Sequence, residues 1–402
     1  VHFMNSIDKG LKPEVVRLRR QLHSIPELAF EEHKTAKAIV HYLTTVCCIP
    51  VSDVRQGVGK TGVLALIRSD RDPNRRCVAL RADMDGLPLS ETSDAIWASK
   101  HPNVMHACGH DAHMAMLLVA ARHLQANRSM FAGTVKLIFQ PAEEGRFGAR
   151  AMIEDGVLED PHVDSIYGAH VWNYCPSGEV HVRQGPLMAA SDTFSVALSG
   201  KGGHGAEPSG TNDCIVAGSQ LVTQLHTIVS RNISPLASGL VTIGTFNAGT
   251  NNNIIADNAN FTGILRYFTD DVRETLKERI SSVCNGIAAS FGVKVDLTHD
   301  VGYPATINHS ADCLNALTRA ASKVVGCCNV KSASLTMAAE DFSYFLNDRP
   351  GCFFFIGSCP ESSLSSGKSS RPHHRADFDI DELCLWHGVN IWVQLILDEL
   401  AP

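Results

Sequence analysis

The chain has 402 residues, of which 44% are hydrophobic and 19% are charged, and its formal net charge is −7. This length exceeds the size at which one hydrophobic core keeps growing, so two domains are expected. The negative charge, without a basic patch, excludes nucleic-acid binding. No apolar run approaches the roughly 20 residues that a membrane-spanning helix needs.

The 13 cysteines are irregularly spaced and form no pattern typical of a disulfide framework. Such usage indicates reduced thiols in a reducing compartment. Residues 1–7 show no charged region followed by an apolar run, so no signal peptide is predicted. We therefore expect a cytoplasmic protein with neither nucleic acid nor a membrane as partner.

Residues 1–185 alternate between helical and strand patterns. Apolar positions recur at helical spacing in three segments, 11–24, 31–46 and 110–124. Nearly all-apolar runs, which are typical of strands buried on both faces, occupy residues 62–67, 77–82, 134–139 and 165–171. Strands separated by helices predict an α/β domain with a mixed or parallel sheet and helices on both sides.

The pattern changes after Gly185. A strand, a helix, two strands, a second helix and a last strand are predicted at residues 192–198, 213–229, 241–246, 259–268, 271–291 and 293–299. This order is that of a ferredoxin-like α+β domain. Alternating helices and apolar strands then resume from Asn308. We therefore predict an α/β domain of residues 1–185 and 305–402, interrupted by an inserted ferredoxin-like domain of residues 186–304.

Two short motifs carry side chains that bind metal ions. Cys108 and His110 are two residues apart, and Glu143 and Glu144 stand side by side after an apolar strand. Cysteine and histidine ligate zinc-like ions, and a carboxylate completes many such sites. A second glutamate beside a ligand glutamate is the base that a metal-activated water needs. The combination predicts a metal-dependent hydrolase.

Several candidate groups stand where predicted strands end. They are Asp83 with Asp85, Glu143 with Glu144, and His170. In an open α/β sheet, ligands gather at the carboxyl ends of the strands. We therefore expect these side chains to converge with Cys108 and His110 at the start of a helix, and His374 to reach the same place from a loop.

Each of these residues also has a simpler explanation. An isolated His170 is more often an ordinary residue than a ligand, and Cys108 can be a small buried hydrophobe. Asp83 and Asp85 can cap a loop, or they can support histidine ligands through hydrogen bonds. His113 falls one helical turn after the first histidine of its helix, where it fits the same supporting role.

Five ordered motifs resemble those of one enzyme family. They are RADMDGLP (81–88), HACGHDAH (106–113), QPAEEG (140–145), GAHVW (168–172) and GGHGAEP (202–208). They resemble the amidohydrolase branch of the dinuclear aminoacylase/carboxypeptidase metallopeptidases, which includes hippurate hydrolase, N-acyl-L-amino acid amidohydrolases and auxin-conjugate hydrolases. The likeness runs from Leu22 to Glu382. It implies a zinc-peptidase-like catalytic domain, and it implies that the ferredoxin-like domain serves as a lid and a dimerisation surface.

The resemblance carries the functional residues of the family onto this chain. The metal ligands match Cys108, His110, Glu144, His170 and His374. The general base matches Glu143, and a lid histidine near the scissile carbonyl matches His204, typically supplied by the partner subunit of a homodimer. Two divalent ions per subunit are implied. Cysteine ligation favours zinc, while imidazole and carboxylate also suit manganese, cobalt or nickel.

Substrate-binding residues are less sharply defined. Asn253 or Arg266 is expected to pair with the free carboxylate of the amino-acid product. Arg266 can equally form a structural salt bridge within the lid. His204 can be only a residue of a glycine-rich turn, although glycines suit close approach to a substrate.

The implied reaction is hydrolysis of the amide bond of N-acyl-L-amino acids, which releases a free amino acid and a carboxylic acid. A metallo-carboxypeptidase or dipeptidase acting on small peptides is the near alternative, because it also cleaves an amide beside a free carboxylate. A catalytically silent binding or regulatory protein is the alternative of a different class. That alternative predicts a lost ligand or base, whereas all six positions are present.

Overall fold

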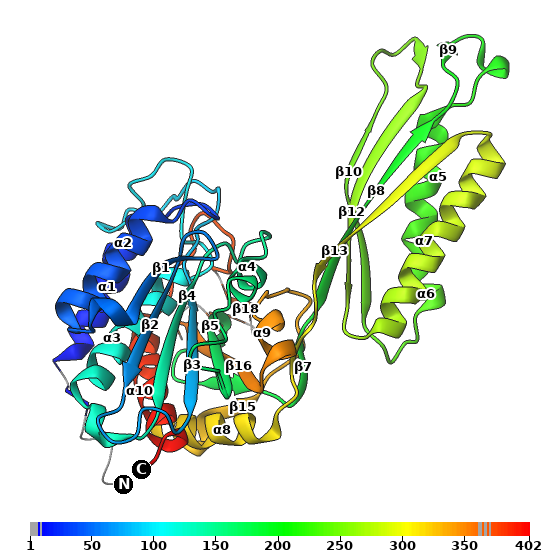
Figure 1. The fold of residues 1–402 in the computed structure, drawn as a ribbon. Helices are drawn as coiled ribbons and strands as arrows, with labels where there is room; N and C mark the ends of the chain where they lie inside the picture. The colour runs from blue at the N-terminus through cyan, green and yellow to red at the C-terminus, as the bar shows by residue number, and fades with distance from the viewer. Residues whose placement is uncertain (1–6, 9, 361–363, 366–367, 370) are drawn as a thin grey trace. The chain divides into compact units, whose positions relative to one another are not determined.

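The computed structural model describes residues 7–8, 10–360, 364–365, 368–369 and 371–402, so most of the amino-terminal stretch considered for a signal peptide lies outside it. The chain divides into two compact units (Figure 1). Unit 1 comprises Val1–Leu187, Ile307–Ser334 and Asp341–Pro402, and unit 2 comprises Met188–Thr306 and Leu335–Glu340. The last segment was not part of the predicted insertion. It joins unit 2 because Ala189 N donates to the carbonyl oxygens of Thr336 and Ala338.

Unit 1 is built on a mixed sheet. In the described part of the chain this sheet has eight strands, in the order β1–β2–β4–β3–β5–β16–β6–β15. They are Val54–Val58 (β1), Gly62–Arg68 (β2), Thr134–Gln140 (β4), Cys77–Asp83 (β3), Ser165–Pro176 (β5), Gly351–Cys359 (β16), Val180–Val182 (β6) and Val330–Ser332 (β15). β4, β3, β5 and β16 are parallel, whereas β2 is antiparallel to both β1 and β4. The predicted α/β class is confirmed.

Helices cover both faces of this sheet. They are α1 (Leu11–His23), α2 (His33–His41), α3 (His110–Ala126), α4 (Gly148–Glu154), α8 (Ala311–Val325), α9 (Ser343–Asp348) and α10 (Leu383–Glu399). Consecutive residues of a strand point to opposite faces. On β16, Phe353 packs against Phe342 just before α9, and Phe354 packs against Trp392 of α10. The two helices therefore lie on opposite sides of the strand.

The register of the parallel strands explains why polar side chains meet at one edge. Asp83 pairs with Gln140 across β3 and β4, and Arg81 pairs with Gly168 across β3 and β5. His170 lies two residues beyond Gly168, so it stands level with Asp83. Because all three strands point the same way, their carboxyl ends bring these groups to one place.

Helix α3 runs through the core of unit 1. Its residues are buried on nearly all sides, including His110, Asp111 and His113 in its first turn. Buried polar side chains need partners, so a first turn of this kind predicts an organised site rather than a simple packing contact.

Unit 2 contains a four-stranded antiparallel sheet, counted over the residues that the structure describes, in the order β10–β12–β8–β13. Its elements are β8 (Ala190–Ser199), α5 (Cys214–Leu225), α6 (Thr227–Asn232), β10 (Gly239–Ala248), β12 (Asn258–Tyr267), α7 (Asp270–Phe291) and β13 (Lys294–Tyr303). Alternate residues of β8 and β12 are buried, as expected for a sheet with helices on one face. This connection order is the ferredoxin-like one.

Six short strands complete the description. β17 (Leu364–Ser365) pairs with β18 (Lys368–Ser369) in unit 1. β9 (Gly203–His204) pairs with β11 (Ile254–Ile255) in unit 2. β7 (Gly185–Met188) and β14 (Thr306–Asn308) lie where the chain passes from one unit to the other. Two sequence predictions were too simple. The helix predicted over 31–46 is α2 followed by a π-helical turn, and the helix predicted over 213–229 is divided into α5 and α6. Among the described residues, no helix has both the length and the apolar character that a membrane span requires.

A buried ion-pair network joins α1 to the start of α3. Asp111 Oδ2 accepts hydrogen bonds from Arg19 Nε and His23 Nδ1, each at 2.8 Å. Arg19 also lies 3.4 Å from Glu382, and His23 Nε2 lies 3.3 Å from Glu91. Because these groups are shielded from water, each charge depends on its partners for stabilisation.

His23 is expected to make the stability of unit 1 fall at alkaline pH. Burial opposes the charged ring, but the Asp111 and Glu91 carboxylates outweigh it and raise the pKa of His23 from 6.5 to about 9. A group with a raised pKa in the folded state stabilises the fold fully below its unfolded pKa. This contribution is therefore complete below pH 6.5 and is lost as the pH rises through about 9.

The measurement is urea unfolding of chelator-treated protein at about pH 6, 8 and 9.5, followed by tryptophan fluorescence. All four tryptophans (Trp97, Trp172, Trp386 and Trp392) belong to unit 1, so the signal reports that unit. The His23→Gln variant is the control, and its stability should lack this alkaline decline. An equal decline in both proteins would show that His23 does not cause it.

Candidate metal centre

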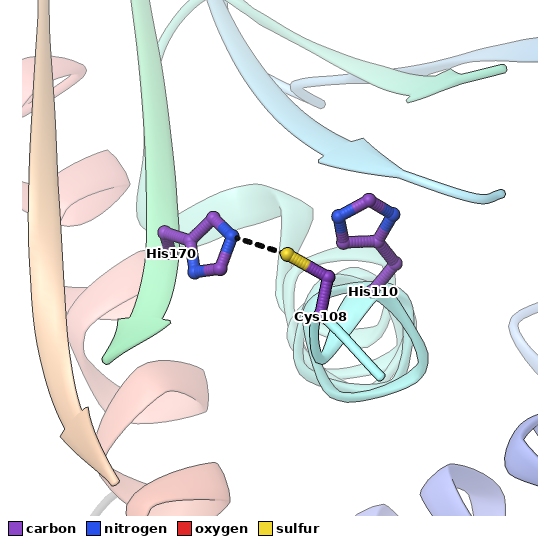
Figure 2. Close-up of side chains that lie close together, drawn as sticks. All are labelled: Cys108, His110 and His170. Carbon is purple, nitrogen blue, oxygen red and sulfur yellow. Dashed lines mark hydrogen bonds between the residues drawn. The ribbon is translucent and has the colours of Figure 1, made fainter. Parts of the chain in front are cut away.

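The turn before α3 brings Cys108 against β5. Gly109 between Cys108 and His110 has a φ of 98°, which favours glycine, and a Cβ there would lie 2.4 Å from Val171 Cγ2. Glycine thus lets the turn pack directly on the strand. As a result, Cys108 Sγ lies 3.3 Å from His170 Nε2, and the His110 ring lies on the other side of the cysteine (Figure 2).

The two histidines of Figure 2 are each fixed through Nδ1. His170 Nδ1 donates to the carbonyl oxygen of Val171 at 2.6 Å, which leaves Nε2 facing Cys108. His110 Nδ1 lies 2.9 Å from the carbonyl oxygen of Asp85. His110 Nε2 is buried and makes no hydrogen bond to any residue that the structure describes. Both rings therefore present Nε2 as the ligand atom.

The loop after β4 supplies the two glutamates. Glu144 N donates to Asp85 Oδ2 at 2.9 Å, and the Glu144 carboxylate lies 3.2 Å from His374 Nε2. Glu143 is 6% exposed, and a carboxylate oxygen of each glutamate lies within 4.8 Å of a ring nitrogen of His110. The predicted base and the predicted carboxylate ligand therefore face the same group.

The structure distinguishes the adjacent histidines of the closing loop. His373 Nδ1 lies 3.2 Å from the carbonyl oxygen of Cys108, and its Nε2 accepts from Asn173 N at 3.1 Å. Both nitrogens of His373 are thus engaged. The next residue, His374, has a φ of 63° and is about half exposed, and its Nε2 points to Glu144. His374 is therefore the better placed ligand of the two.

Asp83 and His113 support His170 of β5 indirectly, through hydrogen bonds to each other and to the backbone of the strand. Asp83 Oδ1 accepts from His113 Nδ1 at 2.6 Å, and His113 Nε2 accepts from Val171 N at 2.9 Å. Arg81 in turn donates to Asp83 Oδ2 at 2.7 Å. Because both nitrogens of His113 are occupied, His113 orients the strand that carries His170 rather than offering a ligand atom.

Carboxylates surround Cys108 and favour a cation at this place. Burial, together with the Glu144 and Glu143 carboxylates, raises the pKa of the Cys108 thiol well above its usual value. Burial opposes the charged form of His110, yet Asp83, Asp85 and Glu144 outweigh it and raise its pKa to about 10. A divalent cation would neutralise the carboxylates and favour the thiolate, which is the form that binds metal.

The donor set fits a metal centre of two ions. Three overlapping groups, Cys108/His110/His170, Cys108/Glu144/His374 and His110/Glu143/Glu144, each place their ligand atoms within 4.8 Å of one another. The groups share members, so their donors form one contiguous cluster. Thiolate, imidazole and carboxylate together suit zinc, manganese, cobalt and nickel. The buried His110 Nε2 makes no hydrogen bond to a described residue and lies 3.7 Å from Asp83 Oδ2, so it is the kind of group that an ion satisfies.

Unit 2 brings His204, predicted as a catalytic residue, close to Asn253, predicted as a substrate-binding residue. The pairing of β9 with β11 sets His204 opposite Ile254, next to Asn253, and Gly205 N donates to the Asn253 carbonyl oxygen at 2.8 Å. His204 and Asn253 both line a cavity of about 780 Å³. Ala206 N donates to His204 Nδ1 at 3.1 Å, so the neutral ring carries its proton on Nε2. That nitrogen is then available to donate a hydrogen bond, as the role predicted for His204 requires.

Arg266 does not belong to this cavity. It lies near the far end of β12, opposite Ser191, whereas Asn258 and Asn260 at the start of the strand line the cavity. Six residues of extended strand separate Asn260 from Arg266, a distance of about 20 Å. Within one unit 2, Arg266 and Asn253 therefore cannot bind the same carboxylate.

Two residues to which the sequence analysis gave no role support the metal centre of unit 1. Asp111 anchors α3 immediately after His110, and Glu32 accepts a hydrogen bond from Ala142 N at 2.9 Å, just before Glu143. Asp111 stands within a recognised motif, so its position was a signal. No local pattern distinguishes Glu32 from the acidic residues around it.

The comparisons with known proteins agree with this geometry. A family model described as peptidase family M20/M25/M40 matches residues 79–398, a stretch that includes every predicted metal ligand and the predicted base. The chain belongs to this family. It is therefore a hydrolase, as predicted.

Three curated relatives match this chain over most of its length and most of their own. YhaA of Bacillus subtilis, provisionally described as an amidohydrolase, is 42% identical over 375 residues, which cover 93% of this chain and 91% of YhaA. Thermostable carboxypeptidase 2 of Saccharolobus solfataricus is 37% identical over 380 residues, covering 93% and 92%. Hippurate hydrolase of Campylobacter jejuni is 37% identical over 348 residues, covering 86% and 88%.

A solved structure supports both the fold and the metal site. The Bacillus subtilis YXEP protein, described as a dinuclear metal-binding peptidase of the M20 family, matches with a TM-score of 0.80 and 32% identity. The match covers 98% of this chain and 99% of that one. The M20 neighbours thus share the architecture of this chain, while the lid and dimerisation roles of unit 2 stay predictions.

Proposed function

We propose that this protein hydrolyses the amide bond of N-acyl-L-amino acids and releases a free amino acid and a carboxylic acid. The observation that carries the proposal is the buried cluster of predicted ligands with Glu143 beside it. The named activities of the relatives, a hippurate hydrolase and an amidohydrolase, agree with this substrate class.

We assign the metal-binding role to five residues of unit 1: Cys108, His110, Glu144, His170 and His374. When bound, two divalent ions would lower the pKa of a water molecule and polarise the scissile carbonyl. Glu143 would act as the general base: it would accept the proton of the attacking water and deliver it to the leaving amine nitrogen. Asp83, Asp85 and His113 hold the ligand side chains in place through the hydrogen bonds described above.

Unit 2 is proposed to supply substrate contacts. His204 donates from Nε2 to the carbonyl oxygen as negative charge develops on it, and loss of such a donor costs about 2.7–4 kcal/mol of barrier. Asn253, at the same cavity, is the nearer candidate for a polar group of the substrate. Arg266 remains the alternative for the free carboxylate. We propose a homodimer or a dimer-based assembly in which His204 comes from the partner subunit.

A carboxypeptidase or dipeptidase is the second candidate. It is favoured by the likeness to a thermostable carboxypeptidase at 37% identity. Both reactions attack an amide beside a free carboxylate, so the same catalytic residues serve either one. The cytoplasm is the proposed location, which the 13 free cysteines support.

A substrate and metal panel tests this proposal. Protein stripped by a chelator is expected to lose activity, because the reaction needs the cation that the ligand cluster binds. Addition of zinc, manganese, cobalt or nickel is expected to restore the release of free amino acid. The panel comprises N-acetyl-amino acids, hippurate, aromatic acyl conjugates and simple dipeptides. Higher kcat/KM for dipeptides would favour the second candidate, and folded protein that is inactive with every metal would contradict both.

A further inference from the structure

The loop that carries Glu143 and Glu144 is held by a buried carboxylate on each side. Asp85 Oδ2 accepts from Glu144 N at 2.9 Å, and Glu32 Oε1 accepts from Ala142 N at 2.9 Å. Glu143 stands between these two anchored amides. The direction of its side chain therefore depends on both carboxylates.

Ala142 needs such an anchor because its backbone is strained. Its φ is 55°, in the left-handed region that is unfavourable for a residue other than glycine. The Ala142 carbonyl oxygen accepts from Gly148 N at 3.0 Å, and a Cβ at Gly148 would collide with the Pro141 carbonyl oxygen. The loop is thus folded tightly back on itself, and the Glu32 carboxylate satisfies the amide at its bend.

Glu32 is itself fixed in place. It is fully buried just before α2, and its Oε2 accepts from the hydroxyl of Thr61, the residue before β2. The carboxylate therefore connects three segments that are distant in sequence. Burial raises the pKa of Glu32, while the hydrogen bonds from Thr61 and Ala142 act in the opposite direction. A buried acceptor with two donors holds its position well.

We propose that Glu32 is a positioning residue for catalysis, which fixes the backbone at Ala142 so that Glu143 faces the reacting groups and Glu144 faces the metal ligands. The inference rests on the proposed function. A purely structural role is the alternative, in which Glu32 stabilises unit 1 without affecting the site. The two roles differ in what they predict for metal geometry and for kcat.

Two substitutions separate the length of the Glu32 side chain from its charge. Glu32→Asp keeps the charge but withdraws the acceptor from Ala142 N by one methylene. Glu32→Gln keeps the length and an acceptor oxygen. Glu27→Gln is the matched control, because the Glu27 carboxylate caps the first turn of α2 by accepting from Lys34 N and Thr35 N, away from the loop.

The experiment titrates each metal-stripped protein with Co²⁺, records the visible absorption spectrum, and then measures kcat and KM for an N-acetyl-amino acid. Glu32→Asp is expected to bind Co²⁺ about 10–100-fold more weakly and to alter the spectrum. Its kcat at saturating metal is expected to fall by about tenfold or more with little change in KM. Glu32→Gln should recover most of both properties, and Glu27→Gln should match the wild type.

Folded Glu32→Asp with the wild-type spectrum and kcat would overturn the inference. If this variant does not fold, Thr61→Val decides, because it removes the other donor to Glu32 and leaves the carboxylate in place. A kcat lowered by about threefold or more would support the inference, and an unchanged kcat would overturn it. Wild-type protein that binds Co²⁺ but hydrolyses no panel substrate would refute the proposed function alone, and the Co²⁺ spectra would still test the role of Glu32.

Discussion

Replacing Glu143 with glutamine is expected to reduce turnover by about 100–10,000-fold, the range that a general base contributes. Glutamine has nearly the same shape, so the loop between Ala142 and Glu144 should keep its conformation. Its amide cannot accept a proton from the attacking water. The metal-binding cluster retains all five proposed ligands, so metal content should not change.

The measurement pairs kcat with metal content determined by elemental analysis on the same sample. Glu154→Gln is the matched control, because Glu154 is an exposed carboxylate on α4 that pairs with Arg150 of the same helix. The control should keep wild-type kcat and metal content. If Glu143→Gln retains wild-type kcat, Glu143 is not the base. If it loses metal as well as activity, the residue acts as a ligand.

The convergence of the site was predictable because it depends on local patterns. Four apolar runs identify buried strands, and parallel strands end at one edge of a sheet. Asp83 and His170 are distant in sequence, yet the register of β3 and β5 sets them level, as the strand-end argument requires. A short polar motif after an apolar run thus carries nearly all the information needed.

The distinction between His373 and His374 came from the family resemblance and not from local chemistry. The two residues are adjacent, and only the backbone conformation decides which ring faces Glu144. His374 adopts a φ of 63°, and the ring of His373 turns toward Cys108 O and Asn173 N. The resemblance pointed to His374 because this residue lies four positions before Phe378, in the segment that matches the closing motif of the family.

Long-range support escaped prediction for a related reason. Glu32 and Arg19 contact residues that lie 110 and 92 positions away in the sequence. Such contacts depend on how α1 and α2 pack against the sheet, and helical periodicity reveals which face is apolar but not which polar residue it buries. Arg266 was predicted from its residue type, because a guanidinium suits a carboxylate. Its position depends instead on the register of β12, which sets it away from the cavity that His204 and Asn253 line.

Replacing Arg19 with methionine is expected to lower the free energy of unfolding of unit 1 by up to about 3–5 kcal/mol, the cost of leaving a buried charge without its partner, because Asp111 then keeps, among the described residues, only His23 as a charged partner. Arg19 is 1% exposed, and its guanidinium neutralises Asp111, which is fully buried. Methionine fills much of the same space, so the loss should come from the charge rather than from a cavity.

Arg20 provides the comparison within the same helix. It forms a shorter contact with Glu382, at 2.6 Å, yet its side chain is 39% exposed. Exposed ion pairs contribute about 0–1 kcal/mol, so Arg20→Met should cost far less in spite of the better distance. The difference between the two unfolding free energies therefore reports the effect of burial on an ion pair, and not the effect of distance.

The free energy of unfolding in urea is measured for both variants in metal-free protein, because bound metal would add its own stabilisation. Tryptophan fluorescence restricts the signal to unit 1. The decisive protein is the double variant that adds Asp111→Asn to Arg19→Met, since removing the carboxylate that has lost its arginine should recover part of the loss, while His23 keeps Glu91 as its remaining charged partner. Equal costs for Arg19→Met and Arg20→Met, or no recovery in the double variant, would mean that the Arg19–Asp111 pair is not what holds the first turn of α3 beside the metal ligands.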